Sequence, residues 1–348
     1  MSVIALIAAV TLTGLYISSG RPLWNGPVSD HFDGTYFYNK EPDHSFLDMV
    51  KWMWQMETVD WPEWIEDGRQ PAPPAYVDGE QLNVTYINQA TVLIQTDSLN
   101  ILTDPIWSQR AGPISWLGVK RVRAPGVRLE NLPKIDIILI SHDHYDHLDL
   151  PSLRKLAERD RPLILVGLGT RQLLNSESIE NVIEMDWWDE YASEGQDIKI
   201  TFVPSRHNSG RSMFGNNRRL WGGFVIESPG GRIYFAGDTA YDKILQAIGE
   251  RFDSFRLTIL PLGSYEKRWF MKSQHINPEE AILIHKMLNS GQSIGIHFGT
   301  FAEHPEQAID AHVIDLKNAL IKHDLGSSKF LLLEFGQGIL ISDAITCR

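Results

Sequence analysis

The chain has 348 residues, and its 32 Lys and Arg against 44 Asp and Glu give a net charge of −12. A hydrophobic content of 43% with 22% charged residues excludes a disordered or collagen-like chain, and the acidic balance argues against a nucleic-acid partner. The single cysteine, Cys347, excludes an internal disulfide, a Cys-based zinc finger and an iron–sulfur cluster. Because the chain also holds 12 histidines, any metal would be bound by imidazole and carboxylate groups.

The N-terminal stretch 1–20 contains an uncharged apolar run over residues 3–17. As a helix, this run would span about 22 Å, which is short for a bilayer core of about 30 Å. A membrane anchor or uncleaved signal is the favoured interpretation, and a cleaved signal or a buried apolar segment are the alternatives. We therefore expect membrane association through this segment, on an undetermined side, or a periplasmic or secreted protein if it is cleaved.

Residues 21–80 form an aromatic-rich extension. Phe46, Leu47, Val50 and Trp54 recur at helical spacing, and neighbouring Trp and Met residues widen the apolar face. Such a helix either packs on a core or lies at a lipid interface. The proline-rich stretch 70–74 then separates this extension from a main domain over 81–348.

The main domain alternates short β-like runs with helical patterns. The sequence predicts strands near 83–88, 91–96, 99–103, 135–140, 198–203, 233–236, 257–260, 293–296 and 330–333. Helices are predicted from Pro151, over 278–288 with Asn277 as N-cap, and over 305–322. This order of elements indicates an α/β domain with two sheets flanked by helices.

A dense group of metal-ligand types follows the apolar run 135–140. His142, His144, Asp146 and His147 form the pattern H-x-H-x-D-H directly after this predicted strand. A tight loop there would direct the side chains to two neighbouring positions, and neutral imidazole with carboxylate suits Zn²⁺, Mn²⁺ or Fe. The motif therefore predicts two adjacent metal ions that share one loop.

Four ligands do not complete two metal sites, and three further ligand types stand at the ends of other predicted strands. These are His207, Asp238 and His297. Each alone is typical of an ordinary polar residue at a strand end. Together with the loop they make seven ligands, which is the number that a dinuclear site with one bridging carboxylate requires.

The sequence resembles the metallo-β-lactamase superfamily and, within it, the N-acyl-phosphatidylethanolamine-hydrolysing phospholipase D family and its bacterial relatives. The resemblance spans about residues 28–345 and is carried by the motifs 29–34 (SDHFDG), 102–105 (LTDP), 141–149 (SHDHYDHLD), 236–239 (AGDT), 270–281 (FMKSQHINPEEA) and 296–301 (IHFGTF). It implies a four-layer αββα sandwich with two zinc ions at one edge.

The resemblance also implies a role for each site residue. One zinc would take His142, His144 and His207, and the other would take Asp146, His147 and His297, with Asp238 as the bridge between them. His275 would bind or polarise a phosphate, and Asp104 would support the ligands from behind. The chain departs from the family by having Asn88-Gln89 where Gly-His is usual, which affects the expected substrate positioning but not metal binding.

Two metal ions about 3.5–4 Å apart would activate a bridging hydroxide for in-line attack on a phosphodiester, with Asp146 or Asp238 orienting it. We expect a phospholipase D-type enzyme that cleaves N-acyl-phosphatidylethanolamine, or a similar lipid, to an N-acylethanolamine and phosphatidic acid at a membrane surface. Arg206 and Arg211, with Arg218 and Arg219, would hold the anionic substrate, and a second basic group, 120–128, is equally typical of a solvated patch. A metal-dependent lactonase or other acyl hydrolase is the alternative, because it would use the same ligands.

Overall fold

The structure is a computed structural model, and it describes residues 23–40, 44–68, 70–193, 197–211, 216–302 and 306–341. The predicted anchor or signal segment 1–20 and Cys347 lie outside the described residues. No helix among the described residues is long and apolar enough to cross a membrane.

The first sheet has seven strands in the order β16-β1-β2-β3-β6-β7-β8. Three consecutive strands form an antiparallel meander, namely β1 (Leu82–Asn88), β2 (Thr91–Thr96) and β3 (Leu99–Thr103). The strands β6 (Ile137–Ile140), β7 (Leu163–Gly167) and β8 (Val182–Met185) then extend it in parallel, and β16 (Gly338–Leu340) closes the other edge.

The second sheet also has seven strands, in the order β15-β14-β13-β12-β11-β10-β9. Its antiparallel half contains β9 (Glu190–Ala192), β10 (Lys199–Val203), β11 (Gly223–Ser228) and β12 (Gly231–Phe235). Its parallel half adds β13 (Phe255–Pro261), β14 (Ser290–Ile296) and β15 (Phe330–Leu332). Because β10 and β12 flank β11 and both run antiparallel to it, β10, β12, β13 and β14 all end at the same edge.

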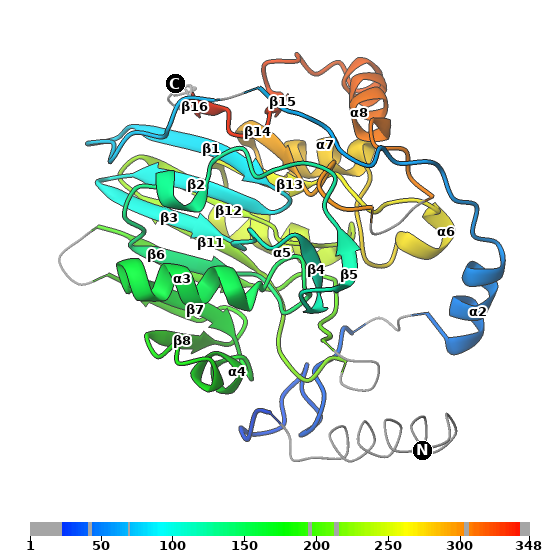
Figure 1. Ribbon diagram of the computed structural model, residues 1–348, viewed down its shortest axis with the longest axis horizontal. Helices are drawn as coiled ribbons and strands as arrows, with labels where there is room; N and C mark the ends of the chain where they lie inside the picture. The colour runs from blue at the N-terminus through cyan, green and yellow to red at the C-terminus, as the bar shows by residue number, and fades with distance from the viewer. Residues whose placement is uncertain are drawn as a thin grey trace.

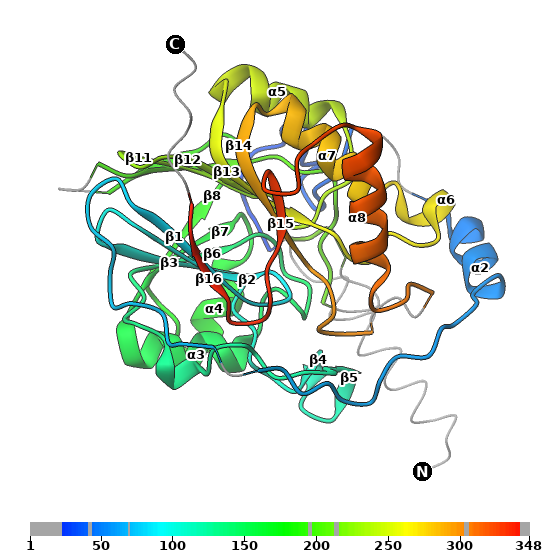
Figure 2. The same cartoon turned by 90° about the horizontal axis from the view of Figure 1, so that it is seen from above.

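The two sheets pack face to face, with helices on both outer faces (Figures 1 and 2). The helices α3 (Leu150–Asp160) and α4 (Arg171–Ser176) cover the first sheet, and α5 (Lys243–Phe252), α7 (Pro278–Met287) and α8 (Ala311–Lys322) cover the second. The alternation along β6 explains this layering: Leu139 packs between the sheets, whereas Ile138 and Ile140 pack under α3 and α4. The predicted four-layer αββα sandwich is confirmed.

The other elements lie around this sandwich. They are α2 (Phe46–Trp54), α6 (Arg268–Met271), the 3₁₀ turn η1 (Leu129–Asn131) and a small hairpin of β4 (Arg110–Ile114) and β5 (Leu117–Lys120). One face of α2 packs on α6, where Trp52 stacks on Phe270 with ring centroids 4.9 Å apart (Figure 1). The opposite face leaves Trp54 90% and Leu47 76% exposed, so α2 combines features of both alternatives that the sequence leaves open.

The predicted strands are all present, but one helix boundary is wrong. The last helix begins at Ala311 and not near residue 305, because residues 306–310 form turns and Asp310 is the N-cap. The prediction for 278–288 is confirmed within one residue. Asn277 accepts a hydrogen bond from the Glu280 N–H, and the Glu280 carboxylate accepts one from the Asn277 N–H, which makes a capping box.

Candidate metal centre

The seven predicted ligands gather where strands of both sheets end. The loop after β6 carries His142, His144, Asp146 and His147. The other three come from the second sheet: His207 follows β10, Asp238 follows β12 and His297 follows β14. Six of the seven side chains are buried, and His144 is half-buried. The fold therefore brings together residues that are up to 155 positions apart in the chain, since His142 and His297 belong to one cluster of side chains.

Three imidazoles form a first group. His142 Nε2 lies 2.9 Å from His144 Nδ1, which is 3.3 Å from His207 Nε2. In His142 and His207 the other ring nitrogen, Nδ1, makes a hydrogen bond that fixes the ring. Ser141 Oγ is 2.9 Å from His142 Nδ1, and His207 Nδ1 donates to the Gln274 carbonyl at 3.1 Å. The Nε2 atoms of His142 and His207 are thus left with lone pairs for a cation.

Asp146, His147 and His297 form a second group. Asp146 Oδ2 is 3.1 Å from His147 Nε2 and 3.2 Å from His297 Nε2. The opposite nitrogen of His147, Nδ1, donates to Asp104 Oδ2 at 2.7 Å. Asp104 is fully buried and also accepts hydrogen bonds from the backbone and side chain of Ser141. Asp104 therefore contacts His147 directly and His142 through Ser141, and its supporting role stays a prediction.

Asp238 lies between the two groups. Its Oδ2 is 3.3 Å from His147 Nε2, 3.2 Å from His297 Nε2 and 3.8 Å from His207 Nε2. The side chain of His275 approaches the same oxygen, with its Nδ1 at 3.9 Å. Asp238 thus approaches members of both groups, and its role as a bridge and the role of His275 toward a substrate stay predictions.

The donor atoms fit metal ions. His147 Nε2 and Asp238 Oδ1 are buried without a hydrogen bond to any described residue, which is costly unless a cation or another group satisfies them. Five imidazoles and two carboxylates, without sulfur, are the ligands that Zn²⁺, Mn²⁺ and Fe accept. The ligand atoms of each group lie within 4.8 Å of one another.

The pKa shifts differ between the two groups of side chains. Burial lowers the pKa of His207 to about 3 and lowers those of His142 and His144, so these rings are neutral. Burial opposes charge on His297 as well, but the carboxylates of Asp238 and Asp146 raise its pKa to about 10. The pKa of Asp238 is correspondingly held well below its usual value, against the effect of burial, by His297 and His147. Both buried carboxylates thus remain ionised.

The arginines near His207 are engaged with the protein itself. The Arg211 guanidinium donates to the carbonyls of Asp143 at 2.9 Å and Leu148 at 2.7 Å and lies over the Tyr145 ring. Arg206 pairs with Asp242 at 2.9 Å. Through these hydrogen bonds Arg211 stabilises the 142–147 loop. A direct role of Arg206 or Arg211 in substrate binding stays a prediction.

Arginines elsewhere in the two basic groups are also engaged. Arg219 pairs with Asp143 at 2.8 Å. In the second group, the buried Arg121 donates to backbone carbonyls, and Arg123 pairs with Asp67 at 3.3 Å.

Gln89 belongs to the site, although the sequence indicates only an effect on the substrate there. Its Nε2 donates to Asp146 Oδ2 at 2.9 Å and lies 3.1 Å from His297 Nε2. Its backbone carbonyl accepts a hydrogen bond from the His297 N–H at 2.7 Å. The sequence marks Gln89 only as part of the departure from the family motif, directly after β1. The fold alone shows that β1 ends beside His297.

Two packed mixed sheets with a His and Asp cluster at their shared edge define a metal-dependent hydrolase of the metallo-β-lactamase type. The family described as "Beta-lactamase superfamily domain" matches residues 99–298. A solved structure with a similar fold is Igni18, a metallo hydrolase from the archaeon Ignicoccus hospitalis. It has a TM-score of 0.57 and 20% identity, and the match covers 75% of this chain and 99% of that one.

Sequence relatives place the chain more narrowly. It is 35% identical over 266 residues to N-acyl-phosphatidylethanolamine-hydrolyzing phospholipase D 1 of Caenorhabditis elegans, covering 74% of this chain and 75% of that protein. It is 38% identical over 222 residues to the mitochondrial N-acyl-phosphatidylethanolamine-hydrolyzing phospholipase D of Saccharomyces cerevisiae, covering 62% of this chain and 47% of that protein. The chain therefore belongs to the β-lactamase superfamily, in the family of these phospholipase D enzymes.

Proposed function

We propose that the protein is a zinc-dependent phosphodiesterase of phospholipase D type that cleaves N-acyl-phosphatidylethanolamine or a similar phospholipid. The products would be an N-acylethanolamine and phosphatidic acid. The observation that carries this proposal is the position of Asp238, within 3.3 Å of His147 and His297 and 3.8 Å from His207. Two relatives that share more than a third of their aligned residues with this chain bear the name of that lipid activity.

The proposed roles follow the two groups. His142, His144 and His207 would hold one ion, Asp146, His147 and His297 the other, and Asp238 both. When bound, two zinc ions supply Lewis acidity that makes water a nucleophile at neutral pH and offsets charge on the phosphate. The ring orientations set by Ser141, Gln274 and Asp104 reduce the reorganisation that ligand binding requires.

The protein groups then direct the hydrolysis. Asp146 and Asp238 accept hydrogen bonds from the attacking water and orient it toward phosphorus. His275, whose Nδ1 lies 3.9 Å from Asp238 Oδ2, donates to a phosphate oxygen. The bond from phosphorus to the ethanolamine oxygen breaks, and that oxygen leaves with a proton, so water adds across the P–O bond with no covalent enzyme intermediate.

A membrane surface is the proposed source of the lipid. The exposed face of α2 carries Leu47, Met53 and Trp54, and the β4–β5 hairpin exposes Trp116. Trp and aliphatic side chains of this kind suit the lipid interface. The helix α2 packs on α6, and α6 ends four residues before His275 in the chain. We propose the segment 1–20 as the anchor, without assigning the domain to one side of the membrane. The division of the chain at residues 20 and 80 stays a prediction.

A paired assay tests the proposal. Zinc-loaded full-length protein would receive N-acyl-phosphatidylethanolamine in mixed micelles or a long-chain lactone, with and without chelator. We expect release of phosphatidic acid that the chelator abolishes and that an Asp238→Ala variant lacks. Lactone opening without lipid cleavage would establish the acyl-hydrolase alternative and overturn the phosphodiesterase assignment. The matched control is Asp324→Ala, which removes a carboxylate outside the site.

A further inference from the structure

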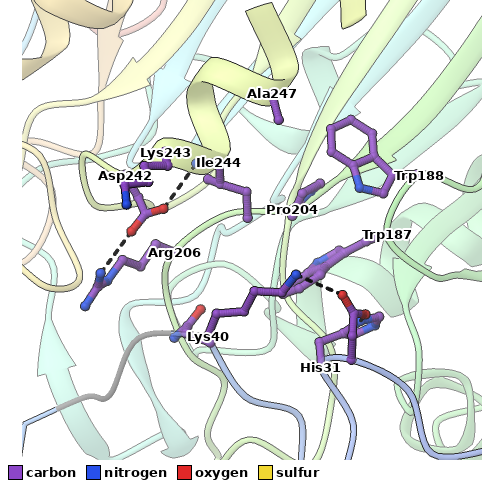
Figure 3. A pocket seen from close by; sticks show the side chains of 12 residues that line it. His31, Lys40, Trp187, Trp188, Pro204, Arg206, Asp242, Lys243, Ile244 and Ala247 are labelled. Atoms are coloured by element: carbon purple, nitrogen blue, oxygen red, sulfur yellow. Dashed lines mark hydrogen bonds and ion pairs between the residues drawn. The ribbon is translucent and has the colours of Figure 1, made fainter. Parts of the chain in front are cut away.

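A cavity lies beside the metal centre, and none of the proposed metal ligands lines it. It has a volume of about 530 Å³ and opens between the 30–40 segment, the Trp187-Trp188 turn and the start of α5 (Figure 3). This volume is within the range of small-molecule sites in proteins. Of the residues given a role in substrate binding or catalysis above, only Arg206 lines it.

One wall of this cavity is aromatic and held in place. Trp187 donates from Nε1 to the Trp221 carbonyl at 2.7 Å, and the His31 ring stacks on it with centroids 4.4 Å apart. Trp188 has a φ of +73°, which is unfavourable for a bulky side chain. Its backbone N–H donates to the Phe202 carbonyl at 2.7 Å, so the sheet maintains this conformation. Strained residues of this kind concentrate at functional positions, and here the strained residue presents its indole to the cavity (Figure 3).

The remaining lining is locally cationic. It contains Lys40, Arg206 and Lys243 against Asp30 and Asp242, a balance of 3 − 2 = +1 in a chain of net charge −12. Lys40 pairs with the exposed Asp30 at 3.0 Å and extends toward Trp187 (Figure 3). Lys243 is exposed and makes no ion pair with any residue that the structure describes. The cavity thus combines an aromatic wall with the ammonium groups of Lys40 and Lys243.

We propose that this cavity binds a small single-chain amphipathic anion. Its apolar body would lie on Trp187, Trp188 and Ile244, and its carboxylate or phosphate would be held by Lys40 and Lys243. Aromatic faces supply apolar area at low entropic cost, and the lysines select an anionic head over a neutral one. Both head groups share this chemistry, so the test separates a fatty carboxylate from a lipid phosphate.

The cavity is close to the centre but distinct from it. Asn39, which lines the cavity, donates to the His207 carbonyl at 2.7 Å, and Arg206 precedes His207 in the chain. Binding in the cavity must therefore be separated from binding at the metals. Measurement on the chelator-treated protein does this, because the cavity uses no metal ligand, and it leaves the result independent of the proposed lipid hydrolysis.

Isothermal titration calorimetry of the full-length protein with chelator tests the proposal, with octanoate, octyl phosphate and the neutral octyl glucoside as probes. We expect one site per chain for octanoate or octyl phosphate and at least tenfold weaker binding of octyl glucoside, which is about 1.4 kcal/mol. The tighter of the two anions identifies the head group. Equal affinity for octyl glucoside, or no heat from either anion at millimolar concentration, would overturn the proposal.

Variants locate the site. Lys243→Glu should weaken anion binding about tenfold or more, whereas Lys155→Glu, an exposed lysine on α3, should not. Ala247→Phe should fill the cavity and abolish binding, whereas the adjacent Gln246→Phe on α5 should leave it intact. Both α5 positions are exposed, so neither change disturbs the core. Unaltered affinity in both Lys243→Glu and Ala247→Phe would show that the anion binds elsewhere and would refute the assignment.

Discussion

The side-chain amide of Gln89 donates a 2.9 Å hydrogen bond to Asp146 Oδ2, the oxygen that also lies 3.1 Å from His147 and 3.2 Å from His297. Gln89 has a φ of +43° at the end of β1, and its backbone binds both His297 and Thr300. A residue outside the proposed ligand set therefore connects the first sheet to two members of the second ligand group.

Replacing Gln89 by Ala should loosen the second ligand group. Hydrogen bonds that support metal ligands commonly contribute 10- to 100-fold to metal affinity. We therefore expect Gln89→Ala to bind the lower-affinity zinc ion of the two about 10-fold less tightly than the wild type does. Competition with a chromophoric chelator measures this affinity. The exposed Gln246→Ala is the control. Zinc affinity equal to that of the wild type would show that Asp146 does not depend on Gln89.

Replacing His275 by Ala should separate catalysis from metal binding. If His275 acts on the substrate, the variant should keep its full zinc content and lose about 100-fold in kcat, as removal of a proton-donating side chain does. Elemental analysis and lipid turnover measured on the same preparation give both quantities. A loss of zinc would instead make His275 a ligand, which its contact with Asp238 at 3.9 Å also permits.

Charging the exposed face of α2 should weaken membrane binding. Trp54→Glu places a carboxylate where an indole is 90% exposed, and insertion of that face into lipid then becomes unfavourable. We expect a smaller fraction of the variant than of the wild type to pellet with phosphatidylcholine vesicles. Turnover of a short-chain soluble phosphodiester should be unchanged. Ile321→Glu, at a position 72% exposed on α8, is the matched control. Equal vesicle binding by Trp54→Glu and wild type would remove α2 from the interface.

His285 should make stability depend on pH away from the metal centre. Burial, with a smaller effect of Lys329 and Lys286, lowers the pKa of His285 to about 4, and its Nδ1 lies 2.7 Å from Ser293 Oγ. Between pH 6.5 and 4 the unfolded chain binds a proton there and the folded chain does not, so stability is full above pH 6.5 and falls as the pH drops toward 4.

The variant His285→Gln removes this titration. Between pH 7.5 and 5 we expect its free energy of unfolding to fall by about 1–2 kcal/mol less than that of the wild type. Urea titrations of the chelator-treated protein at the two pH values measure the difference. The same loss in both proteins would place the acid sensitivity elsewhere, for example at His312, whose pKa burial also lowers to about 4.

The sequence predicts where the candidate ligands lie in the fold when the information is local. His142 to His147 follow an apolar strand within one short loop, and His207, Asp238 and His297 each follow a strand, so strand ends alone place them at a sheet edge. The directions of long side chains, in contrast, cannot be predicted from local sequence. The direction of Arg211 depends on the carbonyls of Asp143 and Leu148, which only the folded loop presents.

Short or irregular elements could not be predicted from the sequence patterns either. The helix α6 has four residues, too few for a recognisable period. The contact of Gln89 with Asp146 joins residues 57 positions apart and depends on a left-handed backbone that no local pattern requires. Likewise, the cavity lined by Trp187 and Trp188 forms only where the 30–40 segment, a turn after β8 and the start of α5 meet in space.

The central claim is a two-metal centre made by seven named side chains, and anomalous scattering at the zinc absorption edge from crystals of the zinc-loaded protein tests it most directly. The account predicts two peaks: one beside His142, His144 and His207, the other beside Asp146, His147 and His297. Asp238 should contact both. A single peak, or peaks away from these side chains, would contradict it.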